Sequence, residues 1–132
     1  MTALSARDVQ RLTGVHPDLV RVVNRAATMT TIPFMVVEGL RTLAKQREYF
    51  AAGKSKTMKS RHLDGHAVDL APLVDLDNDG DLDVSWNAKD FKPIMAAMEQ
   101  AAFELHIPLE LGGKWRGFVD MPHFQLPWAQ YP

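Results

Sequence analysis

The sequence predicts an α+β domain whose helices lead into one small sheet. Apolar residues recur at steps of three and four in several segments, which is the helical period, and short apolar runs bounded by turn residues are typical of strands. The length of 132 residues is enough for one hydrophobic core, and no repeat or linker interrupts the chain. We therefore expect residues 1–132 to form a single compact domain.

The composition excludes several classes of protein. The chain has no cysteine, and 15 Lys and Arg residues stand against 16 Asp and Glu residues. Disulfides, cysteine-based metal clusters and cysteine nucleophiles are therefore excluded, and any metal must be held by His, Asp or Glu. A net charge of −1 argues against nucleic-acid binding. The longest apolar run, over residues 32–37, is far shorter than the roughly 20 residues that cross a bilayer, so we expect no membrane insertion.

Local signals predict where the first helices begin. Ser5 and Asp8 form a variant capping box, which opens a short helix with Val9 and Leu12 on one side. Pro17 favours the first turn of a second helix. The expected buried stripe of this second helix is Leu19, Val22, Val23, Ala26 and Met29.

The rest of the chain alternates between strand and helix signals. Pro93 should lie in the first turn of the clearest helix, which runs from Phe91 to Leu105. The other expected elements are strands over 34–38, 67–73, 109–111 and 123–126, and a helix over 42–52.

Asp69 is a carboxylate in the predicted central strand over 67–73. Burying an ionised Asp is costly unless it is paired or binds a metal, so a cation is expected beside it. His62 and His123 would complete a set of two imidazoles and one carboxylate, which suits a zinc site with an open position. Asp120, three residues before His123, is a candidate for proton transfer. The alternative is that Asp69 pairs with Arg or Lys and that both histidines are structural.

The chain carries two spaced motifs, Ser60-x-His62-x-x-Gly65-x-Ala67-x-Asp69 and Asp120-x-x-His123. Together they resemble the signature of the LAS-type zinc peptidases, in particular the family of D,D-carboxypeptidases and L-alanyl-D-glutamate peptidases. Residues 38–46 and 112–115 resemble further elements of this family, and residues 14–19 resemble the opening of small phage endolysins. The resemblance implies the LAS, or hedgehog-like, peptidase fold, in which helices flank a small, mostly antiparallel central sheet.

The resemblance also implies roles for individual residues. His62, Asp69 and His123 would be zinc ligands. Asp120 would be the general base and acid, and Arg41 would stabilise charge on the scissile carbonyl. Three further side chains are candidates for orienting ligands or substrate: Ser60, Gln46 and Trp115.

An aspartate at position 120 favours one branch of this family. The D-alanyl-D-alanine carboxypeptidases usually have Glu as the acid/base, whereas the phage L-alanyl-D-glutamate peptidases resemble this chain. We therefore expect a zinc-dependent endolysin that hydrolyses the L-alanyl-D-glutamate bond of peptidoglycan stem peptides with metal-activated water. Two alternatives stay open: a D-alanyl-D-alanine carboxypeptidase, and a non-catalytic, metal-bound module that binds the cell wall.

The expected site of action follows from the same family. Residues 1–8 lack the basic and apolar regions of a signal peptide. We expect a monomer made in the cytoplasm of an infected bacterium, which needs a holin to reach the cell wall in the periplasm. Basic residues over 54–61 are expected beside a cleft that receives the anionic D-glutamyl group.

Residues 75–83 are the most biased stretch of the chain and predict a turn or loop. Their aspartates match positions 1, 3, 5, 7 and 9 of an EF-hand calcium loop, with Gly80 at position 6. Trp86 stands at position 12, where an EF-hand has Glu. Calcium binding is therefore one expectation, and a solvated turn rich in Asp and Gly for backbone reasons is the other. The candidate calcium ligands are Asp75, Asp77, Asp79, Asp81 and Asp83.

Overall fold

The computed structural model describes residues 4–55, 57 and 59–132, and these form four α-helices and a five-stranded sheet. No helix in this described part is both long and apolar enough to cross a membrane. In chain order, the elements are α1 (Ala6–Arg11), α2 (Pro17–Met29), β1 (Phe34–Glu38), α3 (Leu43–Ala51), the 3-10 turn η1 (Arg61–Asp64), β2 (Ala67–Val74), β3 (Asp83–Val84), α4 (Ala88–Leu105), β4 (Glu110–Leu111), the 3-10 turn η2 (Gly112–Lys114) and β5 (His123–Gln125).

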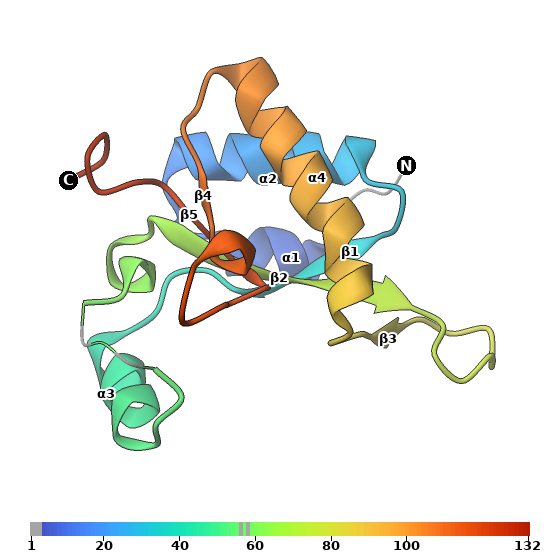
Figure 1. Ribbon diagram of the computed structural model, residues 1–132, viewed down its shortest axis with the longest axis horizontal. Coiled ribbons are helices and arrows are strands. Elements are labelled where there is room, and N and C mark those ends of the chain that lie inside the picture. The colour runs from blue at the N-terminus through green and yellow to red at the C-terminus, as the bar shows by residue number, and fades with distance from the viewer. Residues whose placement is uncertain (1–3, 56, 58) are drawn as a thin grey trace.

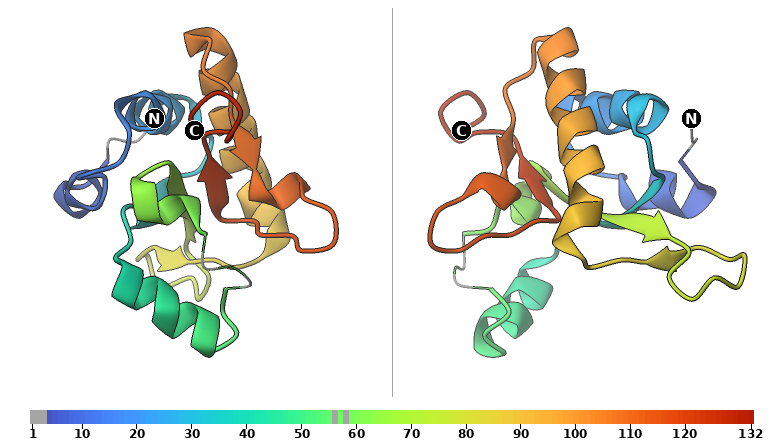
Figure 2. Two further views of the ribbon diagram at one scale, coloured as in Figure 1. Left: turned by 90° about the vertical axis from the view of Figure 1, so that its left-hand side faces the viewer. Right: turned by 45° about the vertical axis from the view of Figure 1, so that its right-hand side comes forward.

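The sheet has the strand order β1-β2-β5-β4, with β3 paired to the far end of β2. Every pairing is antiparallel, which confirms the predicted α+β class. Helices α2 and α4 cross on one side of the sheet, while α3 lies apart on the opposite side (Figures 1 and 2). The strand expected over 67–73 is central, because β2 has a partner along both edges.

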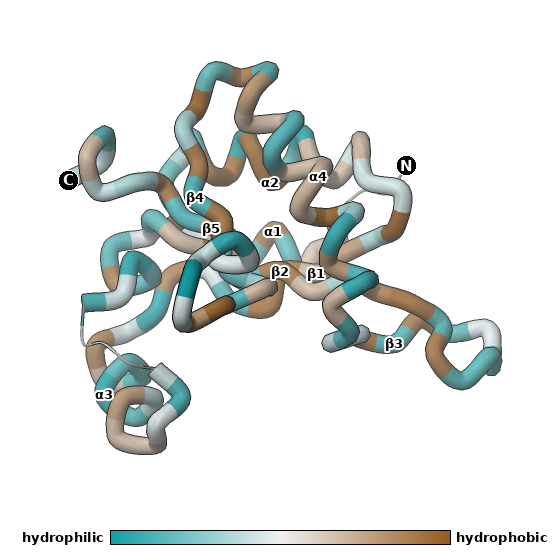
Figure 3. The backbone as a smooth tube through the Cα atoms, in the orientation of Figure 1, coloured by the Kyte–Doolittle hydropathy of each residue, from teal (hydrophilic) through white to brown (hydrophobic). Residues whose placement is uncertain are grey.

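The core lies between the sheet and the helix pair. Hydrophobic stretches run through the middle of the molecule along β2 (Figure 3). The predicted stripe of α2 is buried except for Met29, which packs against the core only in part. The apolar side chains that α4, β2 and β5 add to this core include Ile94, Met98, Ala101, Val68, Leu70 and Phe124.

The capping box predicted for α1 is present, but the helix buries a different side from the one that we expected. Ser5 Oγ accepts from the Asp8 amide at 3.1 Å, and Asp8 Oδ2 accepts from the Ser5 amide at 3.0 Å. Asp8 is itself buried, because its Oδ1 accepts from the Val36 amide of β1 at 2.9 Å. Leu12 is buried as expected, whereas Val9 is 58% exposed. A polar contact to the sheet therefore orients α1, and the prediction for Val9 was wrong.

Helix α4 begins three residues before the predicted start. Its N-cap is Asn87, and Ser85 Oγ takes part in the cap by accepting from the Asn87 amide and donating to Asp90 Oδ2. Pro93 consequently lies in the second turn and not in the first. Pro93 cannot donate a backbone hydrogen bond, so the helix lacks one there.

Two glycines allow loops to approach the strands that carry the site. Gly65 has φ +75°, which lets η1 turn into β2, and a Cβ on it would lie 2.3 Å from the Gly14 carbonyl oxygen. A Cβ on Gly112 would lie 2.4 Å from the Asp120 carbonyl oxygen and 2.9 Å from the His123 Cβ. The turn that bears His62 is therefore closely packed against Gly14, and the turn at Gly112 is closely packed against the segment that bears His123.

Candidate active site

The register of the sheet places three polar side chains in one row. Glu38 of β1 pairs with Asp69 of β2, and Asp69 pairs with His123 of β5. Side chains at paired positions lie on the same face of a sheet. The neighbours Val68 and Phe124 pair with each other and point into the core, as the alternation along a strand requires. One face of the sheet therefore carries the core, and the other carries the polar row.

A β-bulge brings Glu38 into this row. Val36 pairs with Leu70, but Glu38, and not Val37, pairs with Asp69. One extra residue on β1 shifts the register, as a bulge does. Without it, Val37 would stand beside Asp69.

His62 reaches the row from the turn η1. Ser60 caps this turn by accepting from the His62 amide at 3.2 Å. The His62 ring is almost fully buried, and its Nδ1 lies 2.8 Å from the Gly39 carbonyl oxygen. Because a carbonyl oxygen only accepts, Nδ1 carries the proton. The lone pair is then on Nε2, which lies 3.2 Å from Asp69 Oδ1.

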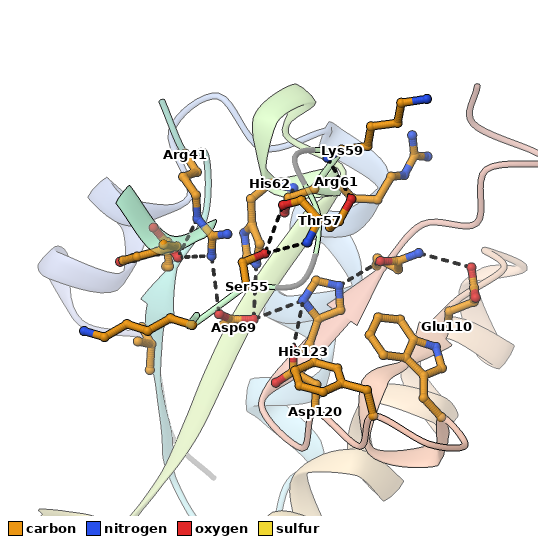
Figure 4. Close-up of a pocket in the computed structure, with 18 of the residues that line it drawn as sticks. Arg41, Ser55, Thr57, Lys59, Arg61, His62, Asp69, Glu110, Asp120 and His123 are labelled. Carbon is orange, nitrogen blue, oxygen red and sulfur yellow. Dashed lines mark hydrogen bonds and ion pairs between the residues drawn. The ribbon is translucent and has the colours of Figure 1, made fainter. Parts of the chain in front are cut away.

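His123 approaches the same carboxylate oxygen from the other side. Its Nδ1 lies 3.2 Å from Asp69 Oδ1, and its Nε2 lies 2.8 Å from Gln125 Oε1. The two imidazole rings are edge to face, with centroids 5.1 Å apart. One ligand atom from each of His62, Asp69 and His123 lies within 4.8 Å of the others. Figure 4 shows both rings converging on Asp69.

The chemistry of this group fits a metal ion. The outer nitrogen of each histidine already contacts an oxygen, so the two inner nitrogens are available as acceptors beside a carboxylate. Burial raises the pKa of Asp69, but when both rings are protonated their hydrogen bonds and positive charge outweigh burial and hold this pKa well below its usual range. When both rings are neutral, with the proton on the outer nitrogen, the inner nitrogens only accept. An ionised carboxylate beside two acceptor nitrogens needs a cation. Imidazole nitrogen and carboxylate oxygen are both ligands that zinc takes.

Asp120 lies next to this group. Its Oδ2 is 4.0 Å from His123 Nδ1. Its amide donates to the Gly112 carbonyl oxygen at 2.9 Å, and its own carbonyl accepts from the His123 amide at 3.1 Å. Burial, followed by the negative charge of Asp69, raises the pKa of Asp120 above its usual range. A raised carboxyl pKa suits a group that exchanges protons near neutral pH.

Arg41 borders the group on the side of β1. Its Nε donates to Glu38 Oε1 at 3.1 Å, its Nη2 donates to the same oxygen, and its Nη1 donates to Gln46 Oε1 at 2.7 Å. Nη2 also lies 4.0 Å from Asp69 Oδ2, and the guanidinium stacks on the Tyr49 ring. Gln46 is fully buried behind Arg41. Gln46 therefore contacts the arginine, and Arg41 is held in one orientation.

These side chains open into a cleft of about 640 Å³. Arg41 and Glu110 lie toward opposite sides of it, with Asp69 and His123 between them (Figure 4). Of the remaining predicted residues, Ser60 and Trp115 line the cleft, and the Trp115 ring lies 5.1 Å from the His123 ring. The structure thus brings together the predicted His, Asp, Arg and Trp residues.

The basic segment expected over 54–61 is divided between two roles. Lys54 and Lys59 line the cleft as expected, while residues 56 and 58 lie outside the described part of the chain. Arg61 borders the cleft but is only 2% exposed. Its guanidinium donates to the Leu126 and Tyr131 carbonyl oxygens and stacks on the Trp128 ring at 3.9 Å. Arg61 therefore lies beside the cleft as expected, and its charge holds the C-terminal segment.

The aspartate-rich loop projects from the opposite end of β2 (Figure 1). Carboxylate oxygens of Asp75, Asp77, Asp79 and Asp83 lie within 4.8 Å of one another. The Asp81 carboxylate is outside this group. Position 7 of an EF-hand loop binds through its backbone carbonyl, so Asp81 stays a candidate ligand. Asp83 belongs to β3, so the loop in the structure ends one residue before the predicted end.

Sequence reasoning missed two polar neighbours of the ligand group, Glu38 and Gln125. Glu38 could have been found as the acid three residues before Arg41, although its place beside Asp69 depends on the bulge. Gln125 stands two residues after His123, and this spacing predicts the same face of a strand. Other cleft residues that were not predicted include Tyr49, Glu110, Phe118 and Trp128.

The fold and the His-Asp-His group define a peptidase whose site can hold a metal ion. More particularly, the chain belongs to the phage L-alanyl-D-glutamate peptidase family, whose model matches residues 1–126. This membership confirms the predicted resemblance and favours that branch over the D-alanyl-D-alanine carboxypeptidases.

Individual relatives agree with this assignment. The L-alanyl-D-glutamate peptidase of Escherichia phage T5 is 35% identical over 115 residues, which are 84% of this chain and 80% of that protein. The enzyme of the same name from Listeria phage A118 is 33% identical over 103 residues, 76% of this chain but 32% of that longer protein. The crystal structure of Serratia marcescens L-Ala D-Glu endopeptidase ChiX superimposes with a TM-score of 0.89 at 45% identity, covering 98% of this chain and 93% of that one.

Proposed function

We propose that this enzyme hydrolyses the L-alanyl-D-glutamate bond of peptidoglycan stem peptides with a zinc ion held by His62, Asp69 and His123. The observation that carries the proposal is the convergence of two oriented imidazoles on one buried carboxylate inside the cleft. Nitrogen and carboxylate donors with an open position are typical of catalytic zinc. When bound, zinc supplies a Lewis acid that polarises the scissile carbonyl and makes water a stronger nucleophile.

Asp120 is the proton carrier of the proposed reaction. Its carboxylate takes a proton from the attacking water as the new C–O bond forms. It then gives this proton to the amine of the D-glutamyl residue as the C–N bond breaks, so that its own ionisation state is restored. The raised pKa of Asp120, caused by burial and by Asp69, favours both halves of this exchange.

Arg41 stabilises the negative charge that develops on the scissile carbonyl oxygen. Its guanidinium is already oriented by Glu38 and Gln46, so little reorganisation is needed during the reaction. Lys54 and Lys59 on the wall of the cleft supply positive charge for the carboxylates of the D-glutamyl part of the substrate. Ser60 acts indirectly, by capping the turn that carries His62.

Mass spectrometry of digested peptidoglycan tests this function. We expect free stem peptides that begin with D-glutamate, and L-alanine left on the muramyl residue. Release of single D-alanine would identify a D,D-carboxypeptidase instead. Retention on cell walls with no soluble product would identify a binding module. The Asp120→Asn variant, digested in parallel, controls for background hydrolysis.

We further propose that the enzyme reaches the wall from inside an infected bacterium through a holin and acts there as a monomer. Support comes from the relatives, two of which are phage proteins. Expression with a holin should lyse a Gram-negative host, whereas expression of either protein alone should not. Light scattering of the purified enzyme should give the mass of one chain.

Calcium binding by the aspartate-rich loop stays a separate prediction. The four clustered carboxylates support it, and the Trp at position 12 speaks against a complete EF-hand. Titration of the zinc-loaded enzyme with calcium is the direct test.

A further inference from the structure

We propose that Glu110 and Gln125 form a relay that fixes the tautomer and the ring orientation of His123 for metal binding. This inference rests on the proposed metal site and names two positioning residues for it. Neither residue lies in the motifs that mark the family resemblance. Gln125 is the second residue after His123 on β5, and Glu110 is on the neighbouring strand β4.

The sheet register aligns the three side chains. Glu110 pairs directly with Gln125 across β4 and β5, and His123 shares the face of Gln125 because two residues separate them. Gln125 Nε2 donates to Glu110 Oε2 at 3.3 Å, and Gln125 Oε1 lies 2.8 Å from His123 Nε2. Gln125 is only 7% exposed, so water competes little for its amide.

Glu110 decides which way the Gln125 amide faces. A glutamine amide has one donor end and one acceptor end, and the two can exchange by a flip. An ionised carboxylate only accepts, so Glu110 selects the orientation with the Gln125 NH₂ group toward itself. The Gln125 oxygen must then face His123.

The orientation of this oxygen decides which His123 nitrogen carries the proton. An amide oxygen accepts, so His123 Nε2 must donate and carries the proton of the neutral ring. Nδ1 is left with its lone pair directed at Asp69, 3.2 Å away. The same contact stops the ring from rotating about its χ2 bond.

The two metal-binding histidines are therefore oriented by different means. His62 donates from Nδ1 to the backbone carbonyl of Gly39, a group that every residue type carries. His123 depends on two side chains, and these can be exchanged. Hydrogen bonds of this kind to a metal-bound histidine typically change metal affinity by about 10- to 100-fold.

Zinc affinity measured by competition with a chelator tests the relay without any need for catalysis. In Gln125→Leu, which removes the acceptor, we expect the affinity to fall about 10- to 100-fold. In Glu110→Gln, which removes the choice of orientation, we expect a smaller fall. Gln100→Leu is the matched control, because Gln100 donates to Glu104 in a similar pair on the exposed surface of α4, and it should bind zinc like the parent enzyme.

The double variant Glu110→Gln, Gln125→Glu exchanges the two groups. The amide now on β4 would donate to the carboxylate now on β5, and this carboxylate would accept from His123 Nε2. The acceptor that faces His123 would therefore be preserved. We expect the exchange to restore most of the affinity that Gln125→Leu loses. Long-range ¹H–¹⁵N spectra of the zinc-loaded protein should show a proton on His123 Nε2 in the parent enzyme and in the exchanged variant.

Two results would overturn the relay: parent-like zinc affinity in Gln125→Leu, or an exchanged variant that folds, by circular dichroism, but binds zinc no better than Gln125→Leu. Failure of the metal site itself has a different signature, because His62→Ala would then leave zinc affinity unchanged.

Discussion

Two groups of potential metal ligands, at opposite ends of β2, differ in how they are built. In each group the ligand atoms lie within 4.8 Å of one another. His62, Asp69 and His123 come from three elements that are far apart in the chain, and they are largely buried. The four aspartates of the second group lie within one exposed turn and the strand end beside it.

The two groups differ in which atoms their hydrogen bonds occupy. In the histidine group, outer partners such as the Gly39 carbonyl occupy the nitrogens that face away from Asp69. The inner ligand atoms are therefore left for a cation. In the loop, Asp75 accepts from the Asp79 and Gly80 amides, and Asp83 accepts from the Leu76 amide. These carboxylates already stabilise the turn without an ion.

Closeness of acidic groups alone does not define a metal site. A hydrogen bond with Asp79 is the main cause that raises the pKa of Asp77, so these side chains interact with each other. In the histidine group, by contrast, the carboxylate and two acceptor nitrogens face one common point, where a positive charge would be stabilised.

Removing a ligand from the histidine group should have the largest effect. In Asp69→Ala, we expect zinc content to fall to background and peptidoglycan hydrolysis to fall by about 10³-fold or more, because the metal contributes several kcal/mol of charge stabilisation. Elemental analysis and a turbidity assay measure these. Asp79→Ala is the control from the loop and should keep both zinc and activity. Equal losses in the two variants would contradict the distinction between the groups.

Asp120→Asn should separate catalysis from metal binding. The amide cannot carry the proton from water to the leaving amine, so we expect kcat to fall by about 10²- to 10⁴-fold. Zinc content should stay at one ion per chain, because Asp120 is not one of the three ligands. Hydrolysis at the normal rate in this variant would refute the assigned role.

Arg41→Ala should lower kcat by about 10²- to 10³-fold, as the loss of one preorganised donor to an oxyanion does. Gln46→Leu should have a smaller effect in the same direction, because Gln46 acts by holding Arg41. Steady-state kinetics on a soluble muropeptide give the split between kcat and KM. Arg25→Ala, which breaks an exposed pair with Glu104, should leave both constants unchanged; a comparable loss there would point to an effect on folding.

Calcium binding by the aspartate-rich loop should be weak, and it is the smallest of the expected effects. Titration calorimetry of the zinc-loaded enzyme should give a Kd in the range of about 10⁻⁴–10⁻³ M that weakly binding extracellular calcium modules show. Asp75→Ala should abolish the heat without changing zinc content. Absence of any heat at millimolar calcium would leave the loop as a solvated turn.

Local chemistry allowed the helices and the ligand types to be predicted. The Ser5–Asp8 capping box and Pro17 set two helix starts, because such signals act within one turn. Asp69 was identified because a carboxylate in an apolar strand is costly without a cation. Val9 and Pro93 were misjudged where a long-range contact or a more distant cap overrode the local pattern.

The sequence by itself determined the kinds of groups at the site and the turns that present them, including His62 after Ser60 and His123 after Asp120. Only the tertiary structure decided their neighbours. The bulge that sets Glu38 beside Asp69 and the pairing of Glu110 with Gln125 both depend on strand register. Register is a property of two strands packed together, and a shift of one residue reverses which face each side chain occupies.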